Sequence, residues 1–293
     1  MISTMLRALI KSMRIRQWVK NGLLFAGLIF DRQLTYLPAL KATVIGFFLF
    51  SLMSSAVYIF NDLIDLESDR KHPRKKDRPL ASGELPIPVA ISAAILFIFV
   101  ALFFSYQLSP AFAYISAFSA LLNVAYSLWL KHIPIIDVIV LAAFYVLRAA
   151  AGVSLIEVNR FSPWIYVFTT FMALFLGIGK RRAEIALLES GNKQTRPVLL
   201  GYTALFLDQL ILVVLSLSIL TYSLYTFSAP NLPENHAMML TIPFVIYGFF
   251  RYLYLVQVRN IGEAPEEILF GDWPIIISLF LWGISVLLIF YIF

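Results

Sequence analysis

The chain has 293 residues, of which 60% are apolar and only 14% are charged, whereas soluble domains carry about a quarter charged residues. This composition excludes an ordinary soluble protein and predicts an all-α polytopic membrane protein. The net charge of +6 is confined to short loops between apolar segments, which argues against nucleic acid as a partner, and the absence of cysteine excludes disulfides, thiolate metal sites and cysteine nucleophiles.

Segments that lack charged residues locate the membrane spans in chain order. The first predicted span, Asn21–Leu37, is the weakest because two adjacent charged residues interrupt it, and the second is Ala42–Asn61. The 46 uncharged residues of Leu85–Leu130 would form a helix of roughly 70 Å, so they must turn back, and Ser109-Pro110 is the natural break. The remaining spans, which bring the number to nine, are Ile135–Ile156, Phe161–Gly179, the first part of Pro197–Pro233, Ala237–Val258 and Trp273–Phe293.

The positive charges lie mostly on one side of these nine spans, which holds 19 of the 23 lysines and arginines. The positive-inside rule therefore places the N-terminus and these loops in the cytosol, in a multi-pass protein of the inner (plasma) membrane. Residues 1–293 are expected to form one transmembrane domain. It has an interfacial helix over about 4–20 and cytosolic loops at 62–86, 180–197 and 259–272.

The first large cytosolic loop begins with acidic residues that directly follow an uncharged span. Asp62, Asp65 and Asp69 stand at i, i+3 and i+7, so a continued helix presents all three on one face, next to Asn61. Carboxylate and amide oxygens suit Mg²⁺, which binds a few carboxylates together with substrate phosphates. The pattern predicts a site for a magnesium-bridged diphosphate, and a solvated acidic helix end is the alternative.

A basic stretch follows, from His72 to Gly83. Cations beside a carboxylate–metal site fit a ligand that carries several phosphates. Pro79 and Gly83 bracket a turn that is expected to bring Arg78 back toward the acidic residues. A merely solvated basic loop is the alternative, and it applies more to Arg74–Lys76 than to Arg78.

Four stretches carry a family resemblance, and they are Arg16–Asn21, Asn61–Asp69, Arg78–Gly83 and Gly179–Glu184. Together they resemble the UbiA superfamily of intramembrane prenyltransferases, within it the decaprenyl-phosphate phosphoribosyltransferase-like branch. The resemblance implies nine helices around a central cavity open to the cytosol. It also implies Mg²⁺-dependent transfer of a 5-phosphoribosyl group from phosphoribosyl diphosphate to a polyprenyl (decaprenyl-like) phosphate, with release of diphosphate.

One loop departs from the pattern of ordinary superfamily members. Aromatic prenyltransferases carry a second aspartate-rich motif after the sixth span, whereas this chain has the basic sequence Lys180-Arg181-Arg182 there. A second Mg²⁺ site is therefore not expected. The additional cations suit a reaction that brings together a diphosphate, a 5-phosphate and a lipid phosphate.

Residue roles follow from the motifs and the resemblance. Asp62, Asp65 and Asp69 are expected to hold Mg²⁺, and Lys20 and Arg78 to act with them at the reacting groups. The acceptor phosphate is already an anion, so no general base is required. Substrate-binding residues are expected to be Asn21, Asn61, Tyr126, Lys131, Asp137, Lys180, Arg181 and Arg182. For Tyr126 and Lys131, anchoring at the membrane interface is the alternative role.

Two alternatives to this function fit part of the sequence. One is a prenyltransferase that moves a prenyl group from a prenyl diphosphate to an aromatic acceptor. The other is a transporter, although the charges cluster on one face, with only Arg148 and Asp208 deep in predicted spans. A buried charge needs a partner, so these two are predicted to pair as a structural tie. A homo-oligomer is compatible with the sequence.

Overall fold

The computed structural model describes residues 2–72, 75–157, 162–189, 197–229, 232–259, 261, 268 and 271–292. These residues form helices and irregular connections without any strand, in agreement with the predicted all-α class. The chain divides into two compact units, residues 1–128 with 147–158 and residues 129–146 with 159–293. Helix α7 (Ile136–Val153) contributes to both units.

Eight helical segments of the described residues are long and apolar enough to span a membrane. Each overlaps a span that the sequence predicts, because runs of uncharged apolar residues set where these helices form. The eight segments are α3 (Leu37–Ile64), α5 (Ile87–Leu108), α6 (Pro110–Leu128), α7, α8 (Pro163–Glu189), α9 (Ala204–Ser228), η5 (Ala237–Thr241) continued by α10 (Ile242–Gln257), and α12 (Trp273–Tyr291).

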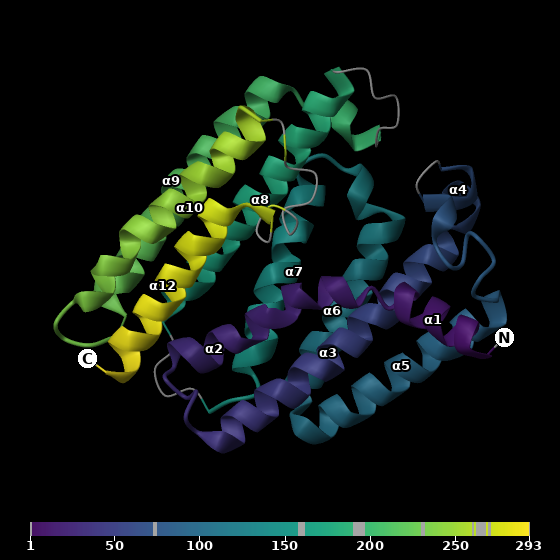
Figure 1. The fold of residues 1–293 in the computed structure, drawn as a ribbon, viewed down its shortest axis with the longest axis horizontal. Coiled ribbons are helices and arrows are strands. Elements are labelled where there is room, and N and C mark those ends of the chain that lie inside the picture. The colour runs from purple at the N-terminus through teal and green to yellow at the C-terminus, as the bar shows by residue number, and fades with distance from the viewer. Residues whose placement is uncertain are drawn as a thin grey trace. The chain divides into compact units, whose positions relative to one another are not determined.

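In the first unit, α3 and α6 both pack against α5, and Figure 1 shows α3 and α5 running side by side. The predicted break at Ser109 is confirmed. Ser109 has an extended backbone that ends α5, and its hydroxyl accepts a hydrogen bond from the Phe112 N–H at 3.3 Å in the first turn of α6. Pro110 then begins α6, a position where its missing N–H costs no hydrogen bond.

The N-terminal segment differs from the prediction of a single helical span over Asn21–Leu37. The chain forms α1 (Ile2–Ser12), a 3₁₀ helix η1 (Ile15–Leu24) and the short helix α2 (Phe25–Phe30). Helix α1 overlaps the first part of the region predicted as an interfacial helix, about 4–20, and η1 covers the end of that region. None of the three is an α-helix long enough to count among the eight spanning segments.

This N-terminal segment nevertheless runs antiparallel to α3. Trp18 Nε1 donates to Ser55 Oγ at 3.0 Å, and the rings of Phe25 and Phe47 have centroids 5.8 Å apart. The residue numbers rise along η1 and α2 while those of their partners fall along α3. The segment therefore accompanies α3 from its C-terminal half toward its N-terminus.

A small apolar cluster fixes the connection between α3 and α5. Leu80 and Leu85 are 2% and 1% exposed and pack with Ile59 of α3. The Leu85 N–H donates to the Pro79 carbonyl at 2.9 Å, and Gly83 adopts a φ of 82°, a left-handed conformation that glycine enters without steric cost. The connection is thus a defined turn anchored by two buried leucines.

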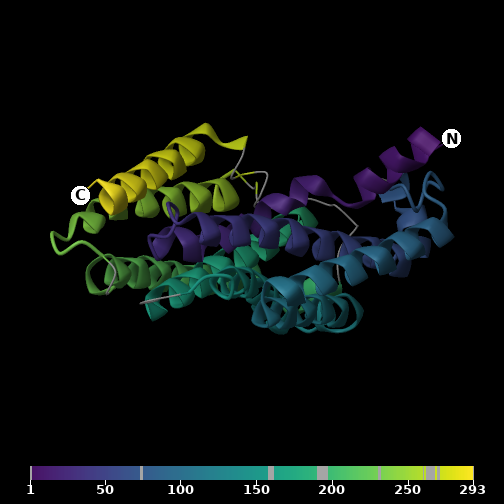
Figure 2. The same cartoon turned by 90° about the horizontal axis from the view of Figure 1, so that it is seen from below.

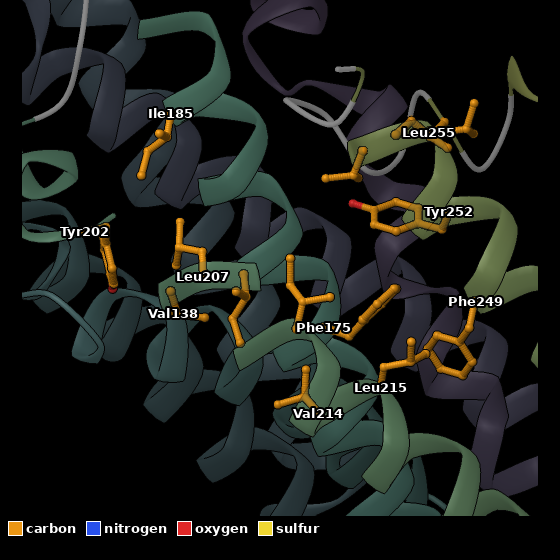
Figure 3. Close-up of a cluster of buried hydrophobic side chains, with 14 of the residues drawn as sticks. Val138, Phe175, Ile185, Tyr202, Leu207, Val214, Leu215, Phe249, Tyr252 and Leu255 are labelled. Atoms are coloured by element: carbon orange, nitrogen blue, oxygen red, sulfur yellow. The ribbon is translucent and has the colours of Figure 1, made fainter. Parts of the chain in front are cut away.

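In the second unit, α8 packs along α9, and α10 lies beside α12 in both views (Figures 1 and 2). Large apolar side chains of this unit form one buried cluster (Figure 3). The cluster includes Val138 of α7, Phe175 of α8, Leu207 and Leu215 of α9, and Phe249 of α10. This core holds the start of α7 against α8 and α9.

Candidate active site

The acidic motif lies where α3 ends and α4 (Leu66–Lys71) begins. Asp62 occupies the last turn of α3, Asp65 lies at the break between the two helices, and Asp69 lies in α4. Asp62 and Asp69 are 3% and 1% exposed. Two carboxylates so well shielded from water require compensating charge or hydrogen bonds.

Arg78 supplies part of that compensation by bridging the two aspartates. Its Nη1 lies 3.0 Å from Asp62 Oδ1 and 2.5 Å from Asp69 Oδ2. Lys75, in the short 3₁₀ helix η2 (Lys75–Asp77), places its Nζ 3.7 Å from Asp69 Oδ1. The predicted turn that returns Arg78 to the acidic residues is confirmed.

Arg14 is a second partner of Asp62, and sequence reasoning missed it. Its Nη2 donates to Asp62 Oδ1, and its guanidinium lies 5.3 Å from the centre of the Tyr58 ring. Arg14 precedes the motif Arg16–Asn21 by two positions and lies outside the four motifs that carry the family resemblance. A contact across 48 positions leaves no signal in sequence spacing.

The expected convergence of three carboxylates is not found in the part of the chain that the structure describes. No three His, Asp or Glu side chains there are placed to hold a metal ion together. The physical reason is the end of α3 at Asp65, because the motif does not continue as one straight helix. Asp62 and Asp69 are the pair brought together, through Arg78.

A buried carboxylate oxygen of this site, Asp69 Oδ1, has no hydrogen-bond partner among the described residues. Carboxylate and amide oxygens are hard ligands, and Mg²⁺ usually takes one or two carboxylates and completes its shell with water and substrate phosphates. The donor set formed by Asp62 and Asp69 therefore fits Mg²⁺.

A polar cavity of about 320 Å³ lies beside Asp62. It is large enough for a small charged group, and three cations and two carboxylates face it, so its wall carries a net positive charge. The lining residues are Lys11, Ser12, Arg14, Asp62, Asp77, Arg78 and Pro79.

The other site residues predicted in the first unit lie on three elements. Lys20 is half-buried in η1, and Tyr126 is half-buried in the last turns of α6. Asn21 is 1% exposed and donates through Nδ2 to Ser51 Oγ at 2.9 Å. Asn61 Nδ2 donates to Asn123 Oδ1 at 3.1 Å. The two asparagines thus link η1 to α3 and α3 to α6.

The remaining predicted residues lie in the second unit, Lys131 in η3 (Leu130–His132), Asp137 in α7 and the basic cluster in α8. The predicted loop 180–197 begins as helix, because α8 continues to Glu189. Lys180 is half-buried on this helix.

Arg181 forms a buried ion pair. Its Nε lies 2.6 Å from Asp137 Oδ2, and both side chains are fully buried. Its Nη1 lies 2.6 Å from Glu184 Oε2. The Tyr202 hydroxyl donates to Asp137 Oδ1 at 2.6 Å, and burial together with this hydrogen bond raises the pKa of the Tyr202 phenol. This geometry gives Arg181 and Asp137 a structural role, which sequence reasoning had not assigned to them.

The pairing of Arg148 with Asp208 stays a prediction, because the two residues lie in different units. Within the second unit, Asp208 Oδ1 accepts from Arg182 Nε at 2.9 Å and from Gln257 Nε2 at 3.0 Å. Within the first unit, Arg148 Nε donates to Asn21 Oδ1 at 2.8 Å. Each charge therefore has at least one polar partner in its own unit.

The model of the UbiA prenyltransferase family matches residues 23–284. The chain belongs to the UbiA prenyltransferase family. It is therefore a membrane transferase of this family and a multi-pass integral membrane protein, as the resemblance of the four motifs indicated.

Relatives within the UbiA family cover nearly the whole chain. A decaprenyl-phosphate phosphoribosyltransferase from Mycobacterium tuberculosis (strain ATCC 25618 / H37Rv) is 31% identical over 278 residues, which is 92% of this chain and 90% of the relative. A protein of the same name from Corynebacterium glutamicum is 29% identical and covers 97% of this chain and 87% of the relative.

Solved structures support the UbiA fold. The structure of a UbiA homolog from Archaeoglobus fulgidus bound to GPP and Mg²⁺ matches with a TM-score of 0.73 at 20% identity, covering 97% of this chain and 100% of that one. Arg74 of the basic stretch and parts of the predicted loops 180–197 and 259–272 lie outside the described residues.

Proposed function

We propose that this UbiA-family transferase moves a 5-phosphoribosyl group from phosphoribosyl diphosphate to a polyprenyl phosphate and releases diphosphate. The names of the relatives support this proposal, since proteins called decaprenyl-phosphate phosphoribosyltransferase align with 92% and 97% of the chain. The observation that carries it is the pair of buried aspartates, Asp62 and Asp69, surrounded by cations that suit phosphate groups.

Asp62 and Asp69 would hold Mg²⁺ in this proposal. The chemistry that Mg²⁺ supplies when bound is neutralisation of the diphosphate that leaves. Arg78 and Arg14 pair with Asp62, and their side chains are partly exposed, at 28% and 31%. They are free to exchange a carboxylate for a phosphate oxygen without crossing the protein core.

The transfer breaks the bond between the anomeric carbon of ribose and the diphosphate oxygen, and the electron pair leaves with diphosphate. An oxygen of the polyprenyl phosphate forms the new bond to that carbon. The acceptor is an anion, so no side chain has to remove a proton. The contribution of the protein is to hold two anions near each other, and fixed cations such as Arg78 and Lys20 lower their repulsion.

We also propose that the N-terminal segment is a ninth membrane crossing. Arg14 meets Asp62 near one end of α3, and Phe25 meets Phe47 farther toward the other end. A 3₁₀ helix rises about 2 Å per residue and an α-helix about 1.5 Å, so η1 and α2 together reach roughly 29 Å, close to the hydrocarbon thickness of a bilayer. The central cavity that the resemblance implies stays a prediction, as do phosphate contacts by Lys131, Lys180 and Arg182.

A reconstituted reaction tests the proposed function. Purified protein in lipid nanodiscs is mixed with Mg²⁺, labelled phosphoribosyl diphosphate and a polyprenyl phosphate, and the organic phase is examined for labelled lipid. A labelled phosphoribosyl lipid, formed with stoichiometric diphosphate and lost on chelation of Mg²⁺, is the expected result.

Two parallel reactions distinguish the alternatives. In the first, a prenyl diphosphate and an aromatic acid replace the two substrates, and a prenylated aromatic product in place of the phosphoribosyl lipid would assign the chain to aromatic prenylation. In the second, liposomes loaded with phosphoribosyl diphosphate are monitored for efflux. Efflux without any lipid product would assign it to transport.

A further inference from the structure

Arg148 is a buried cation inside a membrane span. It lies in α7 and is 8% exposed. Charged side chains within spans are rare, face the protein interior, and mark places where an ion or polar ligand is handled. The steps proposed at Asp62 and Asp69 do not use this cation.

Asn21 and Phe50 hold the Arg148 guanidinium in one orientation. Arg148 Nε donates to Asn21 Oδ1 at 2.8 Å, and Asn21 is itself fixed through its bond to Ser51 Oγ at 2.9 Å. The guanidinium carbon lies 5.9 Å from the centre of the Phe50 ring. The amide of Asn21 at one edge and the ring of Phe50 at one face fix the orientation of the planar guanidinium, which prepares it to bind a ligand.

Arg148 borders a small polar chamber formed by α3, α6 and α7. The chamber has a volume of about 20 Å³, more than one water-sized group needs. Ser116 in its wall is 1% exposed, and its Oγ has no hydrogen-bond partner among the described residues. Arg148 carries the one formal charge among the described residues that line the chamber. The polar lining consists of Ser54, Tyr58, Ser116, Ser119, Asn123 and Arg148.

We propose that this Arg148 chamber is a binding subsite for a phosphate monoester, with Arg148 and Ser116 donating to its oxygens. A guanidinium flanked by hydroxyl and amide groups, without a carboxylate in the wall, provides the donors that a phosphate needs. The ligand also gives the Ser116 hydroxyl the partner that a buried polar atom requires. The proposal rests on the proposed function for the source of the monoester, which is the sugar donor or the lipid acceptor.

The position of the chamber along α3 suits a second phosphate site. Tyr58 and Ser54 precede Asp62 by four and eight residues, which correspond to roughly 6 and 12 Å along a helix. The distance between a diphosphate near Asp62 and a monoester in the chamber would therefore be short enough for the two groups to belong to one sugar phosphate or to two molecules that react with each other. Both substrates carry a monoester phosphate, on the 5-position of the ribose or at the end of the lipid.

Binding measurements without turnover test this proposal on the full-length protein in detergent. Isothermal titration calorimetry compares ribose 5-phosphate with ribose, and geranyl phosphate with geraniol. Three variants are compared with the unmodified chain: Ser116→Ala, Arg148→Gln and the control Ser218→Ala. Ser218 is a buried serine in α9 whose hydroxyl bonds to the carbonyl of Val214 in its own helix at 2.6 Å.

One of the two phosphates should bind the unmodified chain more tightly than its phosphate-free analogue. That affinity should fall roughly three- to tenfold in Ser116→Ala and roughly ten- to a hundredfold in Arg148→Gln, because neutral and charge-assisted hydrogen bonds are lost, and stay unchanged in Ser218→Ala. The probe that loses affinity identifies the sugar or the lipid as the source.

Failure to bind either phosphate, or full affinity in a folded Ser116→Ala variant, would overturn the subsite. Ser116→Ala keeps this test decisive even if Arg148→Gln does not fold, since a serine-to-alanine change suits a helix. Loss of monoester affinity in the variants, together with no phosphoribosyl transfer by the unmodified chain, would support the chamber and contradict the proposed function. The two proposals therefore fail separately.

Discussion

Single residues at the end of α3 show how a membrane span can terminate in a charged site. Asp62 is 3% exposed and contacts both Arg14 and Arg78. The arginines come from opposite sides of Asp62 in the sequence, one before α3 and one after it. They compensate a buried carboxylate, and in the proposed reaction they are the cations that would meet the phosphates of the donor.

Replacing Asp62 or Asp69 by asparagine should lower transfer by at least about a hundredfold, because a neutral amide is a weak substitute for a carboxylate on Mg²⁺. Initial rates of labelled-lipid formation measure the effect. Glu67→Gln is the matched control, since Glu67 lies in the same motif with a side chain 77% exposed and pairs with Arg70. Near-normal turnover of Asp62→Asn, or an equal loss in Glu67→Gln, would contradict the assignment of the site.

The buried pair of Arg181 and Asp137 makes a separate prediction. Asp137→Asn should lower the free energy of unfolding by about 3 kcal/mol, because one partner of a buried ion pair is left uncompensated. The double variant Asp137→Leu with Arg181→Met should recover much of that loss. Thermal unfolding in detergent measures both. A fully stable Asp137→Asn variant with weakened substrate binding would instead return Arg181 to the substrate-binding role that the sequence suggested.

At the scale of elements, the break at Ser109 could be predicted from the sequence, whereas the end of α8 could not. The break at Ser109 follows from local chemistry, because a proline begins the next helix and the uncharged run is too long for one crossing. The continuation of α8 to Glu189 was missed, since Lys180, Arg181 and Arg182 look like loop residues. Arg181 pairs with Glu184 three positions further on, but its fully buried partner Asp137 is 44 positions away, and a partner that distant cannot be found from spacing.

Packing of the N-terminal segment against α7 rests on Gly152. A Cβ built at this position would lie 1.9 Å from the backbone oxygen of Leu24 in η1. Backbone atoms cannot move aside as a flexible side chain would, so Gly152→Ala should lower the free energy of unfolding by at least about 2 kcal/mol.

The control for this prediction is Gly248→Ala in α10. A Cβ at Gly248 meets no atom within 4 Å, so alanine should leave stability unchanged or raise it slightly, by about 0.5 to 1 kcal/mol. Thermal unfolding of both variants in the same detergent compares them. Equal stability of the two variants would show that the close approach between η1 and α7 does not require glycine at position 152.

For the whole molecule, successive spans cross the membrane in alternating directions. With the proposed N-terminal crossing, this alternation assigns each connection to one side of the membrane. The connection after α3 contains Lys75, Arg78 and other cations, so the positive-inside rule predicts that it lies in the cytosol. Lys11 Nζ donates to the Asp77 carbonyl at 3.1 Å in this connection, so the end of α1 shares that side. Counting forward through the spans from α5 places the connection between α9 and η5 on the external side.

Labelling of introduced cysteines tests this map, and the natural chain has no cysteine to interfere. Thr4→Cys and Glu67→Cys should react with a membrane-impermeant maleimide only after cells are permeabilised, whereas Glu234→Cys should react in intact cells. All three positions are exposed, so access to the reagent is set by the membrane and not by the fold. If Thr4→Cys reacts in intact cells while Glu67→Cys stays protected, α1 and the acidic motif lie on opposite sides of the membrane. The ninth crossing would then be wrong, and so would the pairing of Arg14 with Asp62 that depends on it.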